Sequence, residues 1–278
     1  MQLIVKEFAK LGLNAAQTCG VALGRATGLI DFPVPPNSSM RKTGAKTVRN
    51  YYISGVSCYL PIATMALQSG VRLREKISVL DFGCGVGRQL LHFTRNFPVP
   101  AYSACDVDHS AVGFIARNYP SVTARTNKFD PPLPFESGSM DMVYSVSTFS
   151  HINPEHQGDW LREMHRVTRP GGYCFLTTEG WTAFKKLRKM FPSEAAEREL
   201  REKGILYKEY EFYAEAKSHK SLSPVVDTMV GIDKSYGSTA MTPEYIFDKW
   251  NSVGFKVISI VEGIIDNRQD LIVLHKAS

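Results

Sequence analysis

Three alternating glycines, Gly83, Gly85 and Gly87, follow an apolar run that ends at Asp81. A strand, a glycine turn and a helix in this order form a nucleotide site at the carboxyl end of a parallel sheet, because glycine lets the backbone approach a ligand closely. The spacing is G-x-G-x-G, whereas a pyrophosphate-binding turn has G-x-G-x-x-G. The spacing therefore disfavours a nicotinamide dinucleotide, and a purely structural turn is the other interpretation.

A second acidic residue, Asp106, ends the next apolar run, about 20 residues beyond the glycines. At that position a carboxylate can accept hydrogen bonds from the two hydroxyls of a ribose. Asp108 follows closely and is able to share the task. The pattern indicates a ligand that contains a nucleoside.

These residues need a sheet to position them, and from residue 76 strands alternate with helices. The expected strands are ISVLDFG, AYSACDVD, SVTART, SMDMVYSVSTF and YCFLTTEG. Short apolar runs of this kind are typical of buried parallel strands, and the alternation predicts an α/β, doubly wound sheet with right-handed crossovers. FKVISIVEG and QDLIVLHKA, separated by a short loop, predict an antiparallel pair at one edge, which makes seven strands.

The rest of the chain does not show this alternation of strands and helices. Residues 1–75 read as a helical lid that begins with a helix in the first thirty residues, and residues 76–180 form the core. Residues 181–240 are charged and aromatic-rich without strand alternation, so we expect a helical cap inserted after strand five. Residues 241–278 return to the sheet, with Thr242 as a helix cap before Pro243.

Four motifs between Ile77 and Thr178 resemble those of the class I S-adenosylmethionine-dependent methyltransferases, in the same order. They are DFGCGVG, CDVDHS, LPFESGSMDMV and RVTRPGGYCFLTT. The resemblance implies S-adenosylmethionine as cofactor, a Rossmann-like fold with an antiparallel seventh strand, and methyl transfer. It also explains the glycines, since the backbone would pass against the adenosyl and methionine parts of a cofactor that has no phosphates.

The same resemblance implies a role for individual residues around the cofactor. Asp81 and the backbone of Gly83, Gly85 and Gly87 would surround the methionine portion, and Asp106 would hold the ribose with Val107 against the adenine. After the third strand, Asn127 and Asp130 both stand near the position of the adenine amine, and Phe129 is placed to stack on the ring. Tyr144 and Ser145 would line the methyl-transfer site.

His151 is the candidate catalytic residue. It follows the fourth strand by a few residues, at the edge where the methyl group should emerge, and imidazole titrates near neutral pH. It would act as a proton acceptor; the alternative is that it packs against the following helix. Tyr52 and Tyr144 are alternatives for orienting the acceptor.

The expected acceptor is a small molecule, methylated at oxygen or nitrogen, because two caps would enclose the site and exclude water. A nucleic-acid or protein methyltransferase is a rival, but the fourth strand ends in VYSVSTF rather than an Asn-Pro-Pro-Tyr-like tetrad. A non-catalytic, cofactor-binding partner subunit of the same fold is a second rival.

Composition limits the partners further. The net charge is +6, and the five cysteines form no C-x-x-C pair, which argues against a disulfide scaffold and a zinc site and favours a reducing, cytoplasmic location. We expect no metal among the site ligands. No apolar run reaches the ~18 residues of a membrane span, so we expect no membrane partner. The basic run from Arg41 to Arg49 and the mixed charges of 181–220 read as solvated faces rather than a nucleic-acid surface.

Overall fold

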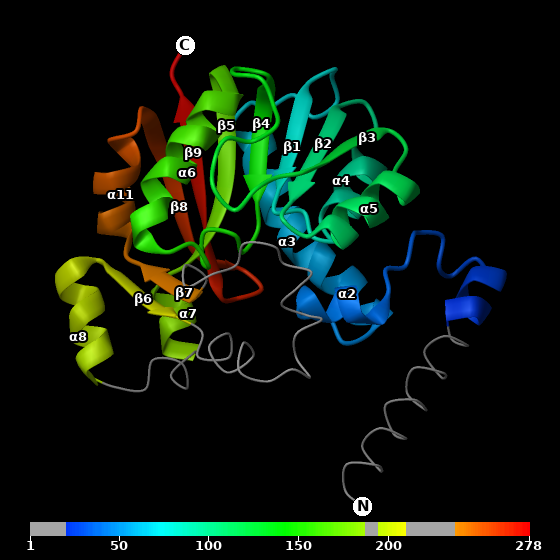
Figure 1. Ribbon diagram of the computed structural model, residues 1–278, viewed down its shortest axis with the longest axis horizontal. Helices are drawn as coiled ribbons and strands as arrows, with labels where there is room; N and C mark the ends of the chain where they lie inside the picture. The colour runs from blue at the N-terminus through cyan, green and yellow to red at the C-terminus, as the bar shows by residue number, and fades with distance from the viewer. Residues whose placement is uncertain (1–20, 187–193, 210–236) are drawn as a thin grey trace, which may run out of the picture.

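The computed structural model describes residues 21–186, 194–209 and 237–278 (Figure 1). The expected N-terminal helix falls largely on residues 1–20, outside the described part, and residues 21–26 are helical. The helices are α2 (Asn37–Lys42), α3 (Val48–Gln68), α4 (Leu90–Asn96), α5 (His109–Asn118), α6 (Pro154–Val167), α7 (Trp181–Lys186), α8 (Glu194–Lys203) and α11 (Pro243–Asn251). Thr242 caps α11 as expected, since its side chain accepts a hydrogen bond from the backbone N–H of Tyr245.

One mixed sheet of nine strands forms the centre of the molecule. The strands are β1 (Ser78–Phe82), β2 (Ala101–Asp106), β3 (Val122–Thr126), β4 (Met140–Ser145), β5 (Thr168–Glu179), β6 (Ile205–Glu209), β7 (Gly237–Met241), β8 (Phe255–Ile265) and β9 (Gln269–Lys276). The first five are parallel in the order β3-β2-β1-β4-β5, which confirms the doubly wound prediction. The order reverses at β1, and ligands bind outside the strand ends at such a switch point.

The antiparallel pair expected at one edge is formed by β8 and β9. Within the pair, β9 is the strand antiparallel to the rest, and it lies between β5 and β8 rather than at the outer edge. Burial explains the placement: residues 269–274 of β9 are all buried, whereas β8 leaves many of its residues partly or fully exposed. A strand that is apolar on both faces needs a neighbour on each side and a layer above and below it.

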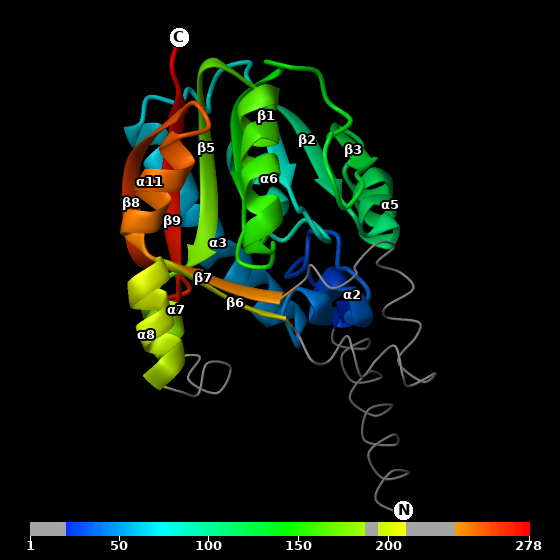
Figure 2. The same cartoon turned by 60° about the vertical axis from the view of Figure 1, so that its left-hand side comes forward.

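The inserted segment contains strands that the sequence pattern did not predict. β6 pairs antiparallel with β7, and β7 joins the end of β5 through Glu179 and Ala240. The helical cap expected for 181–240 therefore also contains strands in its described part, while 187–193 and 210–236 lie outside the described residues. β7 reads GSTAM, with little of the usual strand propensity, so its five buried positions come from tertiary packing rather than from local pattern. Figure 2 shows β6 and β7 crossing below the ends of the main strands.

Helices cover both faces of the sheet, and alternate residues of each strand point to opposite layers. Val79 belongs to the layer that packs under α3, α4 and α5, and the next residue, Leu80, belongs to the layer under α6 and α11. On the first face, the buried Tyr51 of α3 donates a hydrogen bond to the carbonyl of Val86, at 2.9 Å. This bond fixes α3 against the glycine turn. Among the described residues, no helix has both the length and the apolar content that a membrane crossing requires.

Candidate functional site

A cavity of about 560 Å³ lies at the carboxyl ends of β1, β2 and β4. Its walls come from the loops that follow the first four strands, from α2 and α3, and from the β8–β9 turn. The volume falls within the range of pockets that hold small ligands and cofactors. Of the ten residues predicted for the site, seven line this cavity: Gly83, Gly85, Asp106, Val107, Asn127, Phe129 and His151.

The glycine turn leaves no room for a side chain at its first position. Gly83 has φ +74°, and a Cβ atom there would lie 2.2 Å from Oγ1 of Thr148. The backbone N–H groups of Gly83 and Cys84 both donate to the carbonyl of Cys105, at 2.9 and 3.0 Å. The turn is thus tied to the end of β2, and its backbone forms part of the cavity wall.

Gly87 serves a different purpose from the one predicted. Its φ is +77°, but a Cβ atom there would meet Cδ1 of Ile115 at 2.6 Å, and the residue does not line the cavity. The third glycine allows α4 and α5 to pack closely behind the turn, so it supports the site without facing the ligand.

Asp106 lies at the cavity wall with its carboxylate already oriented. Oδ2 accepts a hydrogen bond from the N–H of Gly85 and Oδ1 accepts one from the N–H of Asp108, both at 2.8 Å. Burial raises the pKa of Asp106, and the two backbone donors oppose that rise. Since each carboxylate oxygen has a second lone pair, the group can also accept bonds from two neighbouring hydroxyls, as on a ribose.

Asn127 supplies an independent test of whether an adenosyl group fits. Its Nδ2 donates to the carbonyl of Lys128 at 2.7 Å, whereas its buried Oδ1 has no hydrogen-bond partner. Buried acceptors are nearly always satisfied, so an unpaired one on a cavity wall points to a donor on a ligand. An adenine amine would satisfy it. Asp130, the alternative for this contact, lies instead in a separate hollow near His156.

Asp81 and Tyr144 lie behind the cavity rather than on its wall. The Tyr144 hydroxyl donates to Oδ2 of Asp81 at 3.0 Å, and the two residues are 0% and 2% exposed respectively. Burial raises the pKa of Asp81 to about 7, although the bond from Tyr144 opposes the rise. Both side chains point into the layer under α4, where Tyr144 stacks on Phe93. Asp81 does not line the cavity, and its contact with the methionine portion stays a prediction.

The residues that leave β4 toward the cavity are shifted from the predicted ones. Ser145 is 1% exposed and does not line the cavity, whereas Ser147 and Thr148 do. Ser147 has φ +64°, unusual for a residue with a side chain, and its N–H donates to Oγ1 of Thr177 at 2.8 Å. Its hydroxyl donates to Oε1 of Gln269 at 3.0 Å. The chain turns sharply here, and this turn brings His151 to the wall.

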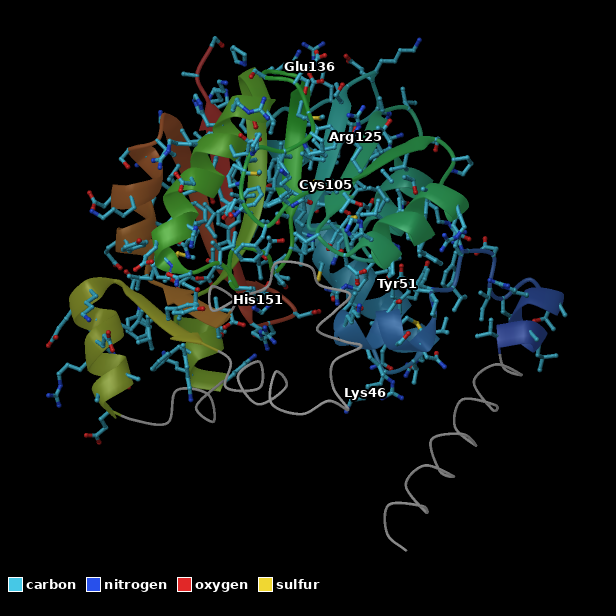
Figure 3. The ribbon with its side chains drawn as sticks, viewed as in Figure 1. Lys46, Tyr51, Cys105, Arg125, Glu136 and His151 are labelled. Carbon is cyan, nitrogen blue, oxygen red and sulfur yellow. The ribbon has the colours of Figure 1, made fainter. Side chains whose placement is uncertain are left out.

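His151 lies below the strand ends, as Figure 3 shows, with its Nδ1 2.9 Å from the carbonyl oxygen of Gly237. A carbonyl can only accept, so Nδ1 carries the proton of the neutral ring and Nε2 is the atom that can take up another. Burial lowers the pKa of His151, while the Gly237 carbonyl and the charge of Glu179 oppose this. The ring is therefore neutral near pH 7, which is the form that accepts a proton.

Ionic and polar contacts close the cavity on the N-terminal side. Lys42 forms an ion pair with Asp108 at 2.7 Å, next to Asp106. Arg88 donates to the carbonyl of Thr43 at 3.1 Å and to Oγ of Ser54 at 3.3 Å. These bonds hold α2 and the start of α3 against the cofactor loops.

The β8–β9 turn closes the other side. Asp266 accepts hydrogen bonds from the Ser57 hydroxyl and, at 3.8 Å, from the Cys58 thiol of α3. Arg268 pairs with the buried Glu179, at 2.5 Å. Sequence reasoning missed these residues together with Lys42, Arg88, Ser147 and Gln269. Only the Asp266-Asn267 pair gave a signal, because both residue types tolerate the positive φ that a tight hairpin turn needs.

Comparison with known proteins adds the family to this geometry. Residues 79–172, from β1 to the start of β5, match the sequence profile of the methyltransferase domain family. This match covers 94 of the 278 residues and identifies a methyltransferase domain within the chain. The carboxylate of Asp106 and the unpaired oxygen of Asn127 fit the ribose and the adenine of S-adenosylmethionine, the cofactor that the sequence motifs imply.

Individual relatives differ in what they are named for. A phthiotriol/phenolphthiotriol dimycocerosates methyltransferase of Mycobacterium ulcerans is 32% identical over 124 residues, 44% of this chain and 42% of its own. A tRNA N(3)-cytidine methyltransferase of Danio rerio is 27% identical over 119 residues, 40% of this chain and 34% of its own. The chain thus spans less than half the length of these curated relatives.

The fold has solved counterparts as well. A crystal structure of a protein from Pyrococcus horikoshii OT3 superposes with a TM-score of 0.53 at 15% identity, over 81% of this chain and 91% of that one. At this identity the likeness concerns the fold alone.

Proposed function

We propose that this chain transfers a methyl group from S-adenosylmethionine to a small-molecule acceptor, at an oxygen or nitrogen atom. The observation that carries the proposal is that one cavity is lined both by Asp106, oriented for a ribose, and by His151, a neutral proton acceptor. The family match supports the reaction type.

Residues on the cofactor side of the cavity would bind and orient the cofactor. Asp106 would accept the ribose hydroxyls and Asn127 the adenine amine, while Val107 and Phe129 supply apolar surface for the base. The backbone of Gly83 and Gly85 lines the cavity and would pass against the methionine portion. Asp81, bonded to Tyr144, would act from behind the cavity wall. When bound, the cofactor supplies an activated methyl group on a sulfonium, so the protein does not need to generate one.

Residues on the acceptor side of the cavity would position the acceptor and remove its proton. The chain would hold the acceptor in line with the methyl group, which contributes most of the rate in such reactions. Nε2 of His151 would take the proton of a hydroxyl or an ammonium as the new bond forms. The bonds of Lys42, Arg88 and Asp266 close the walls on two sides and keep water out. We therefore assign residues 1–75 as a lid and 181–240 as a cap.

We propose a small acceptor rather than a nucleic acid, because the lid and the cap would enclose the acceptor and exclude water. We also propose a cytoplasmic location, supported by four cysteines that are buried and unpaired in the described residues. Fractionation of cells that express the tagged chain would test the location.

The experiment for the reaction is a screen of acceptor classes for conversion of S-adenosylmethionine to S-adenosylhomocysteine. The classes are hydroxylated lipids, fatty acids, small amines, phenols and unmodified tRNA, with Asp106→Ala as the control for site-dependent turnover. We expect turnover with one of the small-molecule classes. Turnover with tRNA alone would overturn the acceptor class, and binding without turnover in any class would favour a non-catalytic partner subunit.

A further inference from the structure

Helix α3 is apolar on its outer side as well as on its inner side. Its buried side includes Tyr51 and Ile62, which pack under the sheet. On the outer side Ile53, Leu60 and Leu67 are 50%, 51% and 48% exposed. They are spaced by seven residues, close to two helical turns, so they form one stripe along the helix. Large exposed apolar side chains aligned in this way mark a contact surface.

Positive charge gathers at the N-terminal end of this stripe. Arg41, Lys46 and Arg49 are exposed, and none of the three has an ion-pair partner among the described residues. Arg49 precedes Ile53 by four positions and therefore lies on the same side of α3. No Asp or Glu occurs between Asp31 and Glu75. Figure 3 shows Lys46 at the lower border of the molecule, away from the sheet.

We propose that the outer face of α3, defined by Ile53, Leu60 and Leu67 with Lys46 and Arg49, lies against an anionic lipid surface. A helix with an apolar stripe and cationic ends rests in the plane of a bilayer interface, with its apolar side chains among the acyl chains. Lys and Arg near the surface add attraction to anionic headgroups. Here the apolar stripe has cationic residues at its N-terminal end, and residues 32–74 contain no carboxylate to offset them.

Other occupants fit the face less well. A second copy of the chain in a twofold dimer would bring the same patch against itself, and Lys46 and Arg49 would then face like charges. Single-stranded RNA would need exposed aromatic rings for stacking. The exposed aromatic residue beside the stripe, Tyr52, is already in contact with the rings of Phe32 and His92.

The lipid contact would lie close to the cavity, because α3 forms part of the lipid-facing surface and part of the cavity wall. Asn50, Ser54 and Cys58 of the same helix line the cavity, so one helix separates the site from the proposed lipid surface. A contact in the plane of the interface needs no spanning helix and therefore agrees with the lack of one in the described residues. The inference departs from the expectation of no membrane partner, which rested on the lack of a spanning run, and it goes beyond the proposed reaction.

The test is co-sedimentation of the full chain with vesicles. One set is pure phosphatidylcholine and the other contains about one-third phosphatidylglycerol. We expect binding to the anionic vesicles at least about tenfold tighter than to the neutral ones, and weaker at high salt because the charges are screened. No binding to the anionic vesicles would overturn the proposal.

Variants locate the contact on α3. Ile53→Ser/Leu60→Ser/Leu67→Ser and Lys46→Glu/Arg49→Glu should each weaken binding to anionic vesicles by at least about tenfold. Phe247→Ser removes a residue that is 45% exposed on α11, over the opposite face, and should bind like the wild type. Thermal melting and S-adenosylhomocysteine binding confirm that each variant is folded.

Two outcomes would overturn the assignment. One is binding by the folded α3 variants that equals binding by the wild type. The other is a wild-type dimer that the triple serine variant dissociates, without vesicle binding by either form.

Discussion

The cofactor side of the cavity comes from the ends of three neighbouring strands, whereas the acceptor side is assembled from segments that are far apart in the sequence. Gly83, Asp106 and Asn127 each follow or end a parallel strand, and backbone bonds within these loops hold them. On the acceptor side, α3, the loop after β4, the start of β7 and the β8–β9 turn meet through side-chain bonds such as those of Asp266. Cofactor binding therefore depends on local backbone geometry, and acceptor choice depends on how distant segments pack.

The largest expected effect lies on the acceptor side. His151→Ala should reduce the rate at saturating cofactor by about 10²–10⁴-fold, the usual loss of a general base. His156→Ala, at a histidine of α6 outside the cavity, is the control and should change the rate less than about twofold. Steady-state assays with the acceptor found by the screen provide the measurement.

The pH profile sharpens the same prediction. Because burial lowers the pKa of His151, the neutral ring persists below the usual pKa of a histidine, and activity should fall only at still lower pH. His151→Gln should lack this acidic limb. An intact limb together with a loss below about tenfold would mean that positioning alone drives transfer.

The next effect should appear on the cofactor side. Gly83→Ala places a Cβ atom 2.2 Å from Thr148, so we expect overpacking to cost about 1–3 kcal/mol in addition to about 1–2 kcal/mol for the left-handed backbone. Gly138→Ala is matched in φ but meets no atom closer than 3.9 Å, so it should show the backbone cost alone. Chemical denaturation gives the free energies of unfolding. Equal losses in the two variants would show that the turn is not tightly packed.

Much of the cofactor side could be predicted from the sequence. The carboxyl ends of parallel strands meet at one edge of the sheet. The order of the strands is therefore enough to predict that Asp106 and Asn127 lie close together. The exceptions have a physical cause. Asp81 and Tyr144 lie at the strand ends, but the alternation of side chains turns them into the α4 layer. Ser145 is the last residue of β4 and precedes the turn at Ser147, so its side chain does not reach the cavity.

The acceptor side could not be predicted in the same way. Arg268 and Gln269 reach the cavity because β9 lies between β5 and β8, a neighbour relation that no local pattern states. Gly237 holds His151 from a strand whose sequence is a poor strand former. Lys42 reaches Asp108, and Arg88 of the glycine loop reaches Thr43, each through a single long side chain. Each of these contacts depends on tertiary packing.

A smaller effect should come from the support behind the cofactor wall. The pKa of Asp81 is raised to about 7 from 3.8, so the folded state keeps a proton that the unfolded state has lost between about pH 4 and pH 7. The free energy of unfolding should therefore fall as pH rises through this window, by up to about 1.4 kcal/mol for each pH unit. Asp81→Asn should flatten this decline.

A surface carboxylate provides the control for this pH dependence of stability. Denaturation of Asp159→Asn, at an exposed position of α6, should give the pH dependence of the wild type. If Asp81→Asn also kept the wild-type slope, the buried carboxyl would not be the protonated group.

The smallest effect is expected at Asp266, where a variant tests whether the acceptor side and the cofactor side of the cavity are independent. Asp266→Ala removes the bonds from the hairpin tip to Ser57 and Cys58, and should lower stability by about 0.5–1.5 kcal/mol. The affinity for S-adenosylhomocysteine should stay within about twofold, because the cofactor loops do not depend on this contact. Asp248→Ala, at an exposed carboxylate of α11, is the control. A large loss of affinity in Asp266→Ala would show that the two sides are coupled.

The central claim is that this cavity binds the adenosyl cofactor through Asp106, and calorimetric titration with S-adenosylhomocysteine tests it most directly. The wild type should bind, and Asp106→Ala should bind about 10- to 100-fold more weakly, since a hydrogen bond to a charged group contributes about 1.5–3 kcal/mol. NADH should not bind. Equal affinity of the two proteins for S-adenosylhomocysteine, or tight binding of NADH by the wild type, would contradict the account.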